Sequence, residues 1–185
     1  VHRIRLTNSA RRLLATMGHD VHVVTATNAV VPPDITIRRV PSTTLLRPLR
    51  MAAFVRRTTD LLRRERFDII HAVSPLAMAD FYQPRGGLIG ETLERNVATR
   101  SSRPRQLLKQ ALLAMNMKQR SLLDLERAVF QNPNVKILAV SKYVASQCER
   151  IYGAMPPRVK VVFNGVRIPL PTPAEKEAHR SEIRG

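Results

Sequence analysis

The chain has 185 residues, of which 44% are hydrophobic and 24% are charged, a balance typical of a folded globular protein and too apolar for a disordered one. Its 31 lysine and arginine residues against 14 aspartate and glutamate residues give a formal net charge of +17. A single cysteine, Cys148, excludes an internal disulfide framework and a cysteine-rich metal site, which favours a reducing, cytoplasmic compartment. No run of residues has the length and apolarity of a membrane span, which predicts a soluble or peripheral protein.

The positive charge requires a polyanionic partner to be considered. Aromatic residues for base stacking are only 4% of the chain, and the arginines are scattered, so nucleic acid is not the expected partner. An anionic membrane surface or a phosphorylated lipid acceptor suits scattered charge better. Arginine-rich codon usage is an alternative that involves no partner at all.

The first part of the chain alternates helical and strand patterns. Apolar residues at steps of three and four predict an amphipathic helix over Arg5–Met17, which Gly18 is placed to end. β-Branched residues predict strands at Asp20–Thr27 and Ile35–Val40. A second amphipathic helix is predicted over Pro48–Arg66, and the arginines of its polar face are expected to contact an anionic membrane: Arg56, Arg57, Arg63 and Arg64.

The same alternation continues to the end of the core. Phe67–Val73 is a continuous apolar run, as expected for a parallel strand covered on both faces, and a short strand is predicted within Met78–Gln83. Pro104–Phe130 is predicted as one long helix, stopped by the Asn-Pro-Asn sequence that follows. The last elements are a strand, a helix capped by Ser141 and ended by Gly153, and a final strand, at Val135–Val140, Lys142–Tyr152 and Val159–Phe163.

Strands separated by helices predict an α/β fold, a Rossmann-like, doubly wound parallel sheet with crossover helices. Such a domain normally opens with its central strand and a glycine-rich turn, so the sheet is expected to lack its first strand. Residues 1–168 are assigned to this domain, incomplete at its amino terminus. Residues 169–185 contain three prolines and then charged residues, and are expected to be a linker into a second, donor-binding domain.

Four segments in order resemble the N-terminal domain of family 4 glycosyltransferases, which have the two-domain GT-B architecture. They are Gly18–Thr25 (GHDVHVVT), Phe67–Ala72 (FDIIHA), Ala139–Val144 (AVSKYV) and Val159–Val166 (VKVVFNGV). The chain departs from the family at Arg167, where the family has aspartate, and it does not contain the family's glycine-rich first loop. Within the family, Met78–Tyr82 and Leu125–Phe130 are similar to the lipopolysaccharide core glucosyltransferase I subgroup.

The resemblance implies transfer of a sugar from a nucleotide sugar to a glycan or lipid-linked acceptor, in lipopolysaccharide or cell-envelope glycan synthesis, at the cytoplasmic face of the membrane. It also implies metal-independent chemistry, with the nucleotide sugar as co-substrate and no further cofactor. The family's donor-binding motif belongs to the second domain, so this chain is expected to be inactive alone. The alternative hypothesis is a non-catalytic basic module that binds anionic membrane or nucleic acid.

Ligands of open α/β sheets bind beyond the carboxyl ends of the strands, so residues that follow strands are the site candidates. Asp80 matches an aspartate of the core glucosyltransferase pattern and is the candidate catalytic residue, able to orient or deprotonate an acceptor hydroxyl. Its alternative is a turn aspartate without chemistry. The candidate substrate-binding residues are His71, Ser74, Arg85, Gly86, Gly87, Ser141, Asn164 and Gly165.

Each binding candidate also has a structural interpretation. His71 fits a core histidine and Ser141 fits a helix cap. The Arg85–Gly87 segment could present a guanidinium and backbone N–H groups to a phosphate, or could be a plain flexible loop. Asn164–Gly165 reads as a tight turn, and only the resemblance makes it a wall of the donor cleft.

Overall fold

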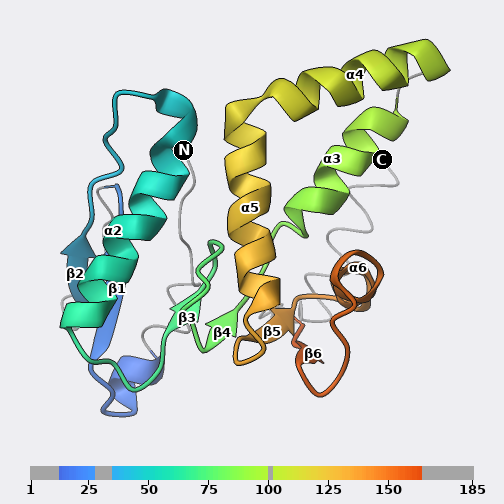
Figure 1. The fold of residues 1–185 in the computed structure, drawn as a ribbon. Helices are drawn as coiled ribbons and strands as arrows, with labels where there is room; N and C mark the ends of the chain where they lie inside the picture. The colour runs from blue at the N-terminus through green and yellow to red at the C-terminus, as the bar shows by residue number, and fades with distance from the viewer. Residues whose placement is uncertain (1–12, 28–34, 100–101, 164–185) are drawn as a thin grey trace, which may run out of the picture.

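The computed structural model describes residues 13–27, 35–99 and 102–163, which form an α/β fold whose described strands all pair in parallel. One sheet pairs β1 (Val21–Thr25) with β2 (Ile35–Arg39). The other has the order β3-β4-β5-β6, with bounds His71–Ala72, Phe81–Tyr82, Lys136–Ala139 and Val159–Val161. The strands follow one another across the view in Figure 1, with β2 at one side and β6 at the other. The predicted fold class is confirmed.

The first sheet is covered by α2 (Arg50–Arg64), which follows the short 3-10 turn η1 (Arg47–Leu49). Phe54, Val55 and Thr58 form the buried face of α2, while arginines occupy its exposed face. The residues 13–16 are helical, and Gly18 ends this helix with φ +84°, a left-handed conformation that glycine adopts without strain. The predicted strands and helix of this region are confirmed, except that the segment 28–34 and residues 1–12 lie outside the described residues.

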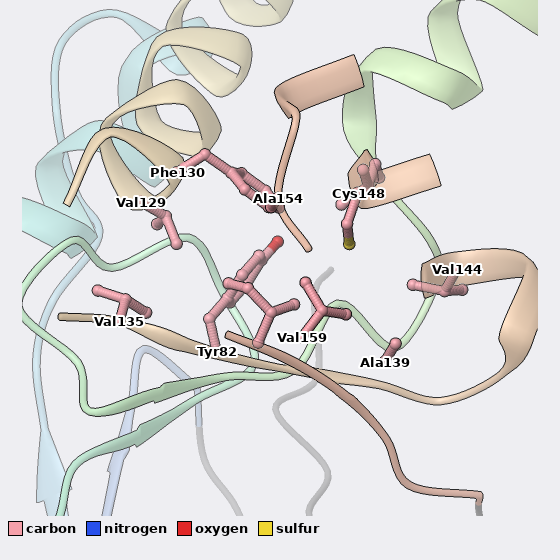
Figure 2. Packing of buried hydrophobic residues seen from close by; sticks show 11 residues of the cluster. Tyr82, Val129, Phe130, Val135, Ala139, Val144, Cys148, Ala154 and Val159 are labelled. Carbon is pink, nitrogen blue, oxygen red and sulfur yellow. The ribbon is translucent and has the colours of Figure 1, made fainter. Parts of the chain in front are cut away.

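The second sheet holds the larger core, where side chains from α5, α6 and the strands point toward one another (Figure 2). Val135, Ile137 and Ala139 of the β5 region are fully buried, as the continuous apolar pattern predicts for a central parallel strand. Phe130 stacks on Tyr152 with ring centroids 4.1 Å apart, which joins α5 to α6. The Ser141 hydroxyl accepts the Val144 N–H at 3.1 Å and so caps α6 (Lys142–Tyr152), and Gly153 ends this helix at φ +63°, both as predicted.

The predicted long helix Pro104–Phe130 is wrong, because the chain turns at Asn116. Asn116 is extended and separates α4 (Arg103–Met115) from α5 (Met117–Gln131). Its side chain accepts the Gln119 N–H at 3.3 Å, and asparagine is a favoured residue for starting a helix in this way. A further helix, α3 (Ile89–Ala98), precedes α4.

The predicted strand Phe67–Val73 is much shorter in the structure. Only His71–Ala72 forms β3, and Ile69 is 67% exposed. Its partner β4 is also two residues long, because the predicted Met78–Gln83 strand narrows to Phe81–Tyr82, and this limits the ladder between the two strands.

Arg158 satisfies the carboxyl end of α5. Its guanidinium donates hydrogen bonds of 2.6–3.0 Å to four backbone oxygens, those of Val129, Phe130, Asn132 and Val135. The last carbonyls of a helix have no partner within the helix and carry its negative dipole end, so a cation there is favourable. One of the many arginines of the chain therefore has a structural role.

Candidate functional site

Two adjoining clefts open at the carboxyl edge of the strands. The first, about 510 Å³, is lined by residues that follow β1, β2 and β3 and by the start of α2. The second, about 310 Å³, is lined by residues that follow β3 and β4. Met51, Ser74 and Leu122 line both clefts, so these form one continuous recess. This is the edge where open α/β sheets bind their ligands.

The recess is lined by cations. Arg47, Arg50 and Lys118 line the first cleft and Arg85 lines the second. Among the described residues that line either cleft, none is aspartate or glutamate. Guanidinium and ammonium groups without competing carboxylates attract anions, and a guanidinium can bind a phosphate through two parallel hydrogen bonds.

The loop after β4 is held against α6. Gly87 has φ +82°, and a Cβ atom added there would lie 3.3 Å from the side-chain oxygen of Gln147. The same oxygen accepts the Leu88 N–H at 3.2 Å. Glycine is therefore favoured at position 87, mainly by its left-handed backbone conformation and also by this close approach. The Arg85–Gly87 segment is a shaped wall of the second cleft, which favours the interpretation of a built loop over that of a plain flexible one.

The first turn of α3 is anchored by a carboxylate that is fully buried. Glu126 of α5 accepts the N–H groups of Ile89 and Gly90 at 2.8 and 3.1 Å, and the hydroxyl of Tyr152 at 2.8 Å. Burial raises the pKa of Tyr152, and the negative charge of Glu126 adds to this, so the phenol stays protonated and donates. Because Glu126 occupies the N–H groups at the start of α3, these groups are not available to a ligand in the cleft.

A second carboxylate, that of the mostly buried Glu91, ties α3 to α6. Glu91 accepts a hydrogen bond from the Tyr143 hydroxyl at 2.6 Å and pairs with Arg95 at 2.6 Å and with Arg150. The hydrogen bonds from Tyr143 and Arg95, helped by the charge of Arg150, lower the pKa of Glu91. Arg150 also pairs with Glu94 at 2.9 Å. These ion pairs have a structural role between the two helices and do not line the recess.

A sequence model of glycosyltransferase family 4 matches residues 5–168, which is most of the chain. The chain belongs to glycosyltransferase family 4. Its fold is similar to the crystal structure of WaaG, a glycosyltransferase involved in lipopolysaccharide biosynthesis, with a TM-score of 0.73 and 18% sequence identity. The alignment covers 96% of this chain and 47% of the WaaG chain, so the chain spans about half the length of that relative. No curated protein sequence matched the chain.

The resemblance to this family and to half of a GT-B fold is thereby confirmed. In this family 4 chain, the structure brings four of the predicted binding residues together at the recess: Ser74, Arg85, Gly86 and Gly87. Ser141 follows β5 at the same edge, but its hydroxyl is used as the cap of α6. Asn164 and Gly165 lie outside the described residues, as does the assigned linker 169–185.

His71 and Asp80 do not line the recess. Asp80 precedes β4, at the amino edge of the sheet, where its carboxylate accepts the Ile70 N–H at 2.6 Å and its backbone oxygen accepts the Lys136 N–H at 2.9 Å. This placement favours the structural interpretation, and a catalytic role for Asp80 stays a prediction. Partial burial lowers the pKa of His71, a hydrogen bond with Gln83 opposes this, and the charge of Arg85 lowers it further. His71 lines the gap between β1 and β3 instead.

Sequence reasoning missed most of the first cleft. Thr27 is the last residue of the first predicted strand and Ser42 lies two residues after the second, so the rule that selected Ser74 could also have selected them. Arg47 lies in η1 and Arg50 is the first residue of α2, and no local pattern distinguishes either of them from other arginines. Among the described residues, no group of three or more histidine, cysteine, aspartate or glutamate side chains is placed to hold a metal ion, and metal-independent chemistry stays a prediction.

Proposed function

We propose that this chain is the acceptor-side half of a glycosyltransferase that moves a sugar from a nucleotide sugar to an anionic glycan or lipid-linked acceptor, in lipopolysaccharide or cell-envelope glycan synthesis. The observation that carries the proposal is the recess at the carboxyl edge, with basic residues and no described acidic residue in its lining. Membership of family 4 supports the transfer of a sugar. The similarity to WaaG, a glycosyltransferase involved in lipopolysaccharide biosynthesis, supports the anionic acceptor.

In this proposal the basic side chains hold phosphate groups of the acceptor and so orient one of its hydroxyls. Arg47 and Arg50 bind from the α2 side, and Arg85 binds from the loop after β4. Ser74, which lines both clefts, is placed to hydrogen-bond the glycan between them. Holding an acceptor in a reactive orientation is a major contribution to catalysis of a two-substrate reaction. The donor diphosphate is held by groups outside this chain, so the chain by itself binds acceptor without transferring sugar.

The test compares two forms of one glycan. The probe is the deacylated, phosphorylated core oligosaccharide of a bacterial lipopolysaccharide, with its enzymatically dephosphorylated form as the control, titrated calorimetrically at low and physiological salt. We expect the phosphorylated form to bind more tightly and Arg47→Gln combined with Arg50→Gln to weaken binding by about tenfold or more, since charge-assisted hydrogen bonds to phosphate are strong. Equal binding of both forms would refute an anionic acceptor.

The matched control for these variants lies on the same helix. Arg56 and Arg63 are on the exposed face of α2, outside both clefts. Arg56→Gln combined with Arg63→Gln removes the same charge, so an equal loss of affinity would show non-specific attraction only. Incubation of the chain with common nucleotide sugars and the phosphorylated probe is expected to give no turnover. Robust turnover would contradict the assignment of the donor site to groups outside the chain.

A peripheral location on an anionic membrane is proposed as well, through α4. One face of this helix is apolar and 56–80% exposed, and it consists of Leu107, Leu108, Leu112 and Met115. The sequence of α4 contains no acidic residue, and Arg103 and Lys109 lie beside its apolar face. A helix of this kind can insert its apolar face among lipid headgroups while its cations meet anionic lipid. In Figure 1, α4 lies across the top of the view, while strands β3 to β6 lie at the bottom. No described helix has the length and apolarity needed to cross a bilayer.

This location differs from the one that the sequence suggests. The arginines Arg56, Arg57, Arg63 and Arg64 of α2 are the sequence-based candidates for membrane contact. In the structure, Arg57 is engaged, because its guanidinium donates to the carbonyl oxygens of Pro41 at 2.6 Å and Thr43 at 3.1 Å. The exposed face of α2 also lacks the apolar residues that α4 offers.

Vesicle co-sedimentation tests the membrane surface. Wild type is expected to bind phosphatidylglycerol vesicles, not phosphatidylcholine vesicles, and to remain bound when duplex DNA competes. Leu108→Glu combined with Leu112→Glu should abolish binding, whereas Leu45→Glu, at a fully exposed leucine away from α4, should leave it unchanged. Binding that survives the α4 change would refute this surface, and binding to DNA alone would favour the non-catalytic, nucleic-acid-binding alternative.

A further inference from the structure

The turn that follows β4 forms one wall of the second cleft and is anchored at both ends. Pro84 and Leu88 are fully buried, whereas Gly86 between them is exposed. The Gly87 N–H donates to the Pro84 carbonyl oxygen at 3.2 Å, which closes a β-turn with Arg85 and Gly86 at its centre. Arg85, Gly86 and Gly87 line the cleft, so the turn presents its central residues to a ligand there.

Most backbone donors of this segment are used by the fold itself. Gly87 donates within the turn, and the next three N–H groups donate to side-chain oxygens of Gln147 and Glu126. Within the described parts of the chain, the N–H groups of Arg85 and Gly86 have no acceptor, and the Arg85 guanidinium forms no hydrogen bond or ion pair. Three donor groups of one turn are therefore left for a ligand in the cleft.

Gln147 of α6 touches the turn although it lines neither cleft. Its side chain is buried, and its oxygen accepts the Leu88 N–H at 3.2 Å. The same oxygen lies 3.3 Å from the place that a Cβ atom would take on Gly87. One amide oxygen thus sets both the direction of the backbone after the turn and the distance between the turn and α6.

We propose that Gln147 is a positioning residue of the recess. It holds the turn so that the N–H groups of Arg85 and Gly86 and the Arg85 guanidinium bind one phosphate group together. This inference rests on the proposed function, because the phosphate is one that the acceptor carries. A guanidinium beside backbone N–H groups is a favourable arrangement for a phosphate, and donors that are already held in place lose little freedom on binding.

The amide of Gln147 matters for its hydrogen bond and not for its size. Methionine at this position would fill a similar volume but would leave the buried Leu88 N–H without its acceptor. The turn would then be free to move away from α6. A more mobile turn must be ordered when phosphate binds, so its affinity for phosphate falls.

The first experiment titrates inorganic phosphate into the full chain and follows the amide signals of Arg85 and Gly86 and the side-chain N–H signal of Arg85 by nuclear magnetic resonance. In the wild type we expect phosphate to shift these signals. Arg85→Gln should weaken phosphate binding by about tenfold and Gln147→Met by about fivefold. In the double variant Gln147→Met should add little to the loss, because it acts through the turn that carries Arg85.

Two further variants separate positioning from a general loss of stability. Cys148→Ala changes the next residue of α6, whose buried side chain belongs to the larger core (Figure 2), and should lower stability without weakening phosphate binding. Gly87→Ala changes the same contact from the other side, because its added Cβ atom meets the Gln147 oxygen and strains the left-handed backbone. It should weaken phosphate binding as Gln147→Met does, and it gives the answer if Gln147→Met does not fold.

The possible results decide the proposal and distinguish it from the proposed function. Absence of phosphate-induced shifts at Arg85 and Gly86 would overturn the phosphate site. Unchanged affinity in Gln147→Met, additive losses in the double variant, or an equal loss in Cys148→Ala would overturn the positioning role. The titration is repeated with the phosphorylated and dephosphorylated core oligosaccharides. If both forms bind equally while inorganic phosphate still shifts the turn signals in the wild type and binds more weakly to Gln147→Met, the acceptor class is wrong and the role of Gln147 stands.

Discussion

The buried carboxylate of Glu126 should be one of the most sensitive positions of the fold. It satisfies three donors, the N–H groups of Ile89 and Gly90 and the Tyr152 hydroxyl, and is itself fully buried. A hydrogen bond to a charged group contributes about 1.5–3 kcal/mol net. The combined contribution of the three bonds to Glu126 is partly offset, because truncation also removes a desolvated charge. Glu126→Ala is therefore expected to lower the free energy of unfolding by about 3–5 kcal/mol.

Glu126→Gln separates the loss of charge from the loss of the side chain. The amide oxygen can still accept one of the two N–H groups at the start of α3, but its NH₂ group faces the other donor. We expect a smaller loss, about 1–3 kcal/mol, with the two variants ordered Ala below Gln below wild type.

Urea unfolding followed by circular dichroism measures these differences, and hydrogen exchange at Ile89 and Gly90 locates them. Glu149→Ala, at an exposed glutamate of α6, is the control and should change stability by less than about 0.5 kcal/mol. If Glu126→Ala is unfolded without urea, the glutamine variant gives the magnitude. A loss below about 0.5 kcal/mol in both variants would refute the reasoning that these donors depend on Glu126.

Three further predictions concern other buried or paired groups. Arg158→Ala should lower the free energy of unfolding by about 2–4 kcal/mol, and Arg158→Lys should recover little of it because one ammonium cannot reach four carbonyl oxygens. Urea unfolding of both variants measures this loss, and full recovery by lysine would contradict the prediction. Burial raises the pKa of Cys148 to about 12, so iodoacetamide at pH 8 should label only the unfolded chain. Mass spectrometry measures the labelling, and rapid labelling of the native protein would argue against a buried thiol. Because the pKa of Glu91 is lowered on folding, its contribution to stability is present above the unfolded pKa and is lost as pH falls below that value. Glu91→Gln should therefore flatten the acid side of the plot of unfolding free energy against pH. An unchanged slope would contradict this prediction.

The parts of the fold that could be predicted from sequence have local causes. Gly18 and Gly153 end helices because each adopts a left-handed conformation, and Ser141 begins α6 because its hydroxyl accepts a nearby N–H. These signals involve residues within a few positions of each other, so they are legible without the tertiary structure. The same holds for the apolar face of α2 and for the β-branched strand β1.

The errors arose where distant contacts decide. The apolar stripe continues across Asn116, so periodicity alone predicts one helix, although the asparagine side chain starts a new one. Hydrophobicity also does not reveal whether a neighbour covers an apolar face, and the apolar face of α4 is exposed. The role of Asp80 stays a prediction, because the family resemblance selects it and only the pairing of β3 with β4 shows that it stands at the amino edge.

The positions of the charged residues bear on how the net charge of +17 should be explained. Several arginines are paired within the fold: Arg158 with carbonyl oxygens, Arg57 with the segment before η1, and Arg95 and Arg150 with glutamates. If biased codon usage alone explained the remaining arginines, acidic residues would be expected beside them at the same low frequency over the whole surface.

Two surfaces, the recess and the exposed face of α4, instead combine cations with neighbouring residues that suit an anionic glycan or lipid. The recess at the carboxyl edge has no acidic residue among its described lining, and α4 joins cations to an exposed apolar face that codon bias in favour of arginine would not produce. A surface for single-stranded nucleic acid would offer aromatic stacking platforms, whereas α4 offers leucine and methionine. Leucine and methionine flanked by lysine and arginine suit a lipid headgroup layer, and in the function proposed above a lipid-linked acceptor would reach the recess from such a layer.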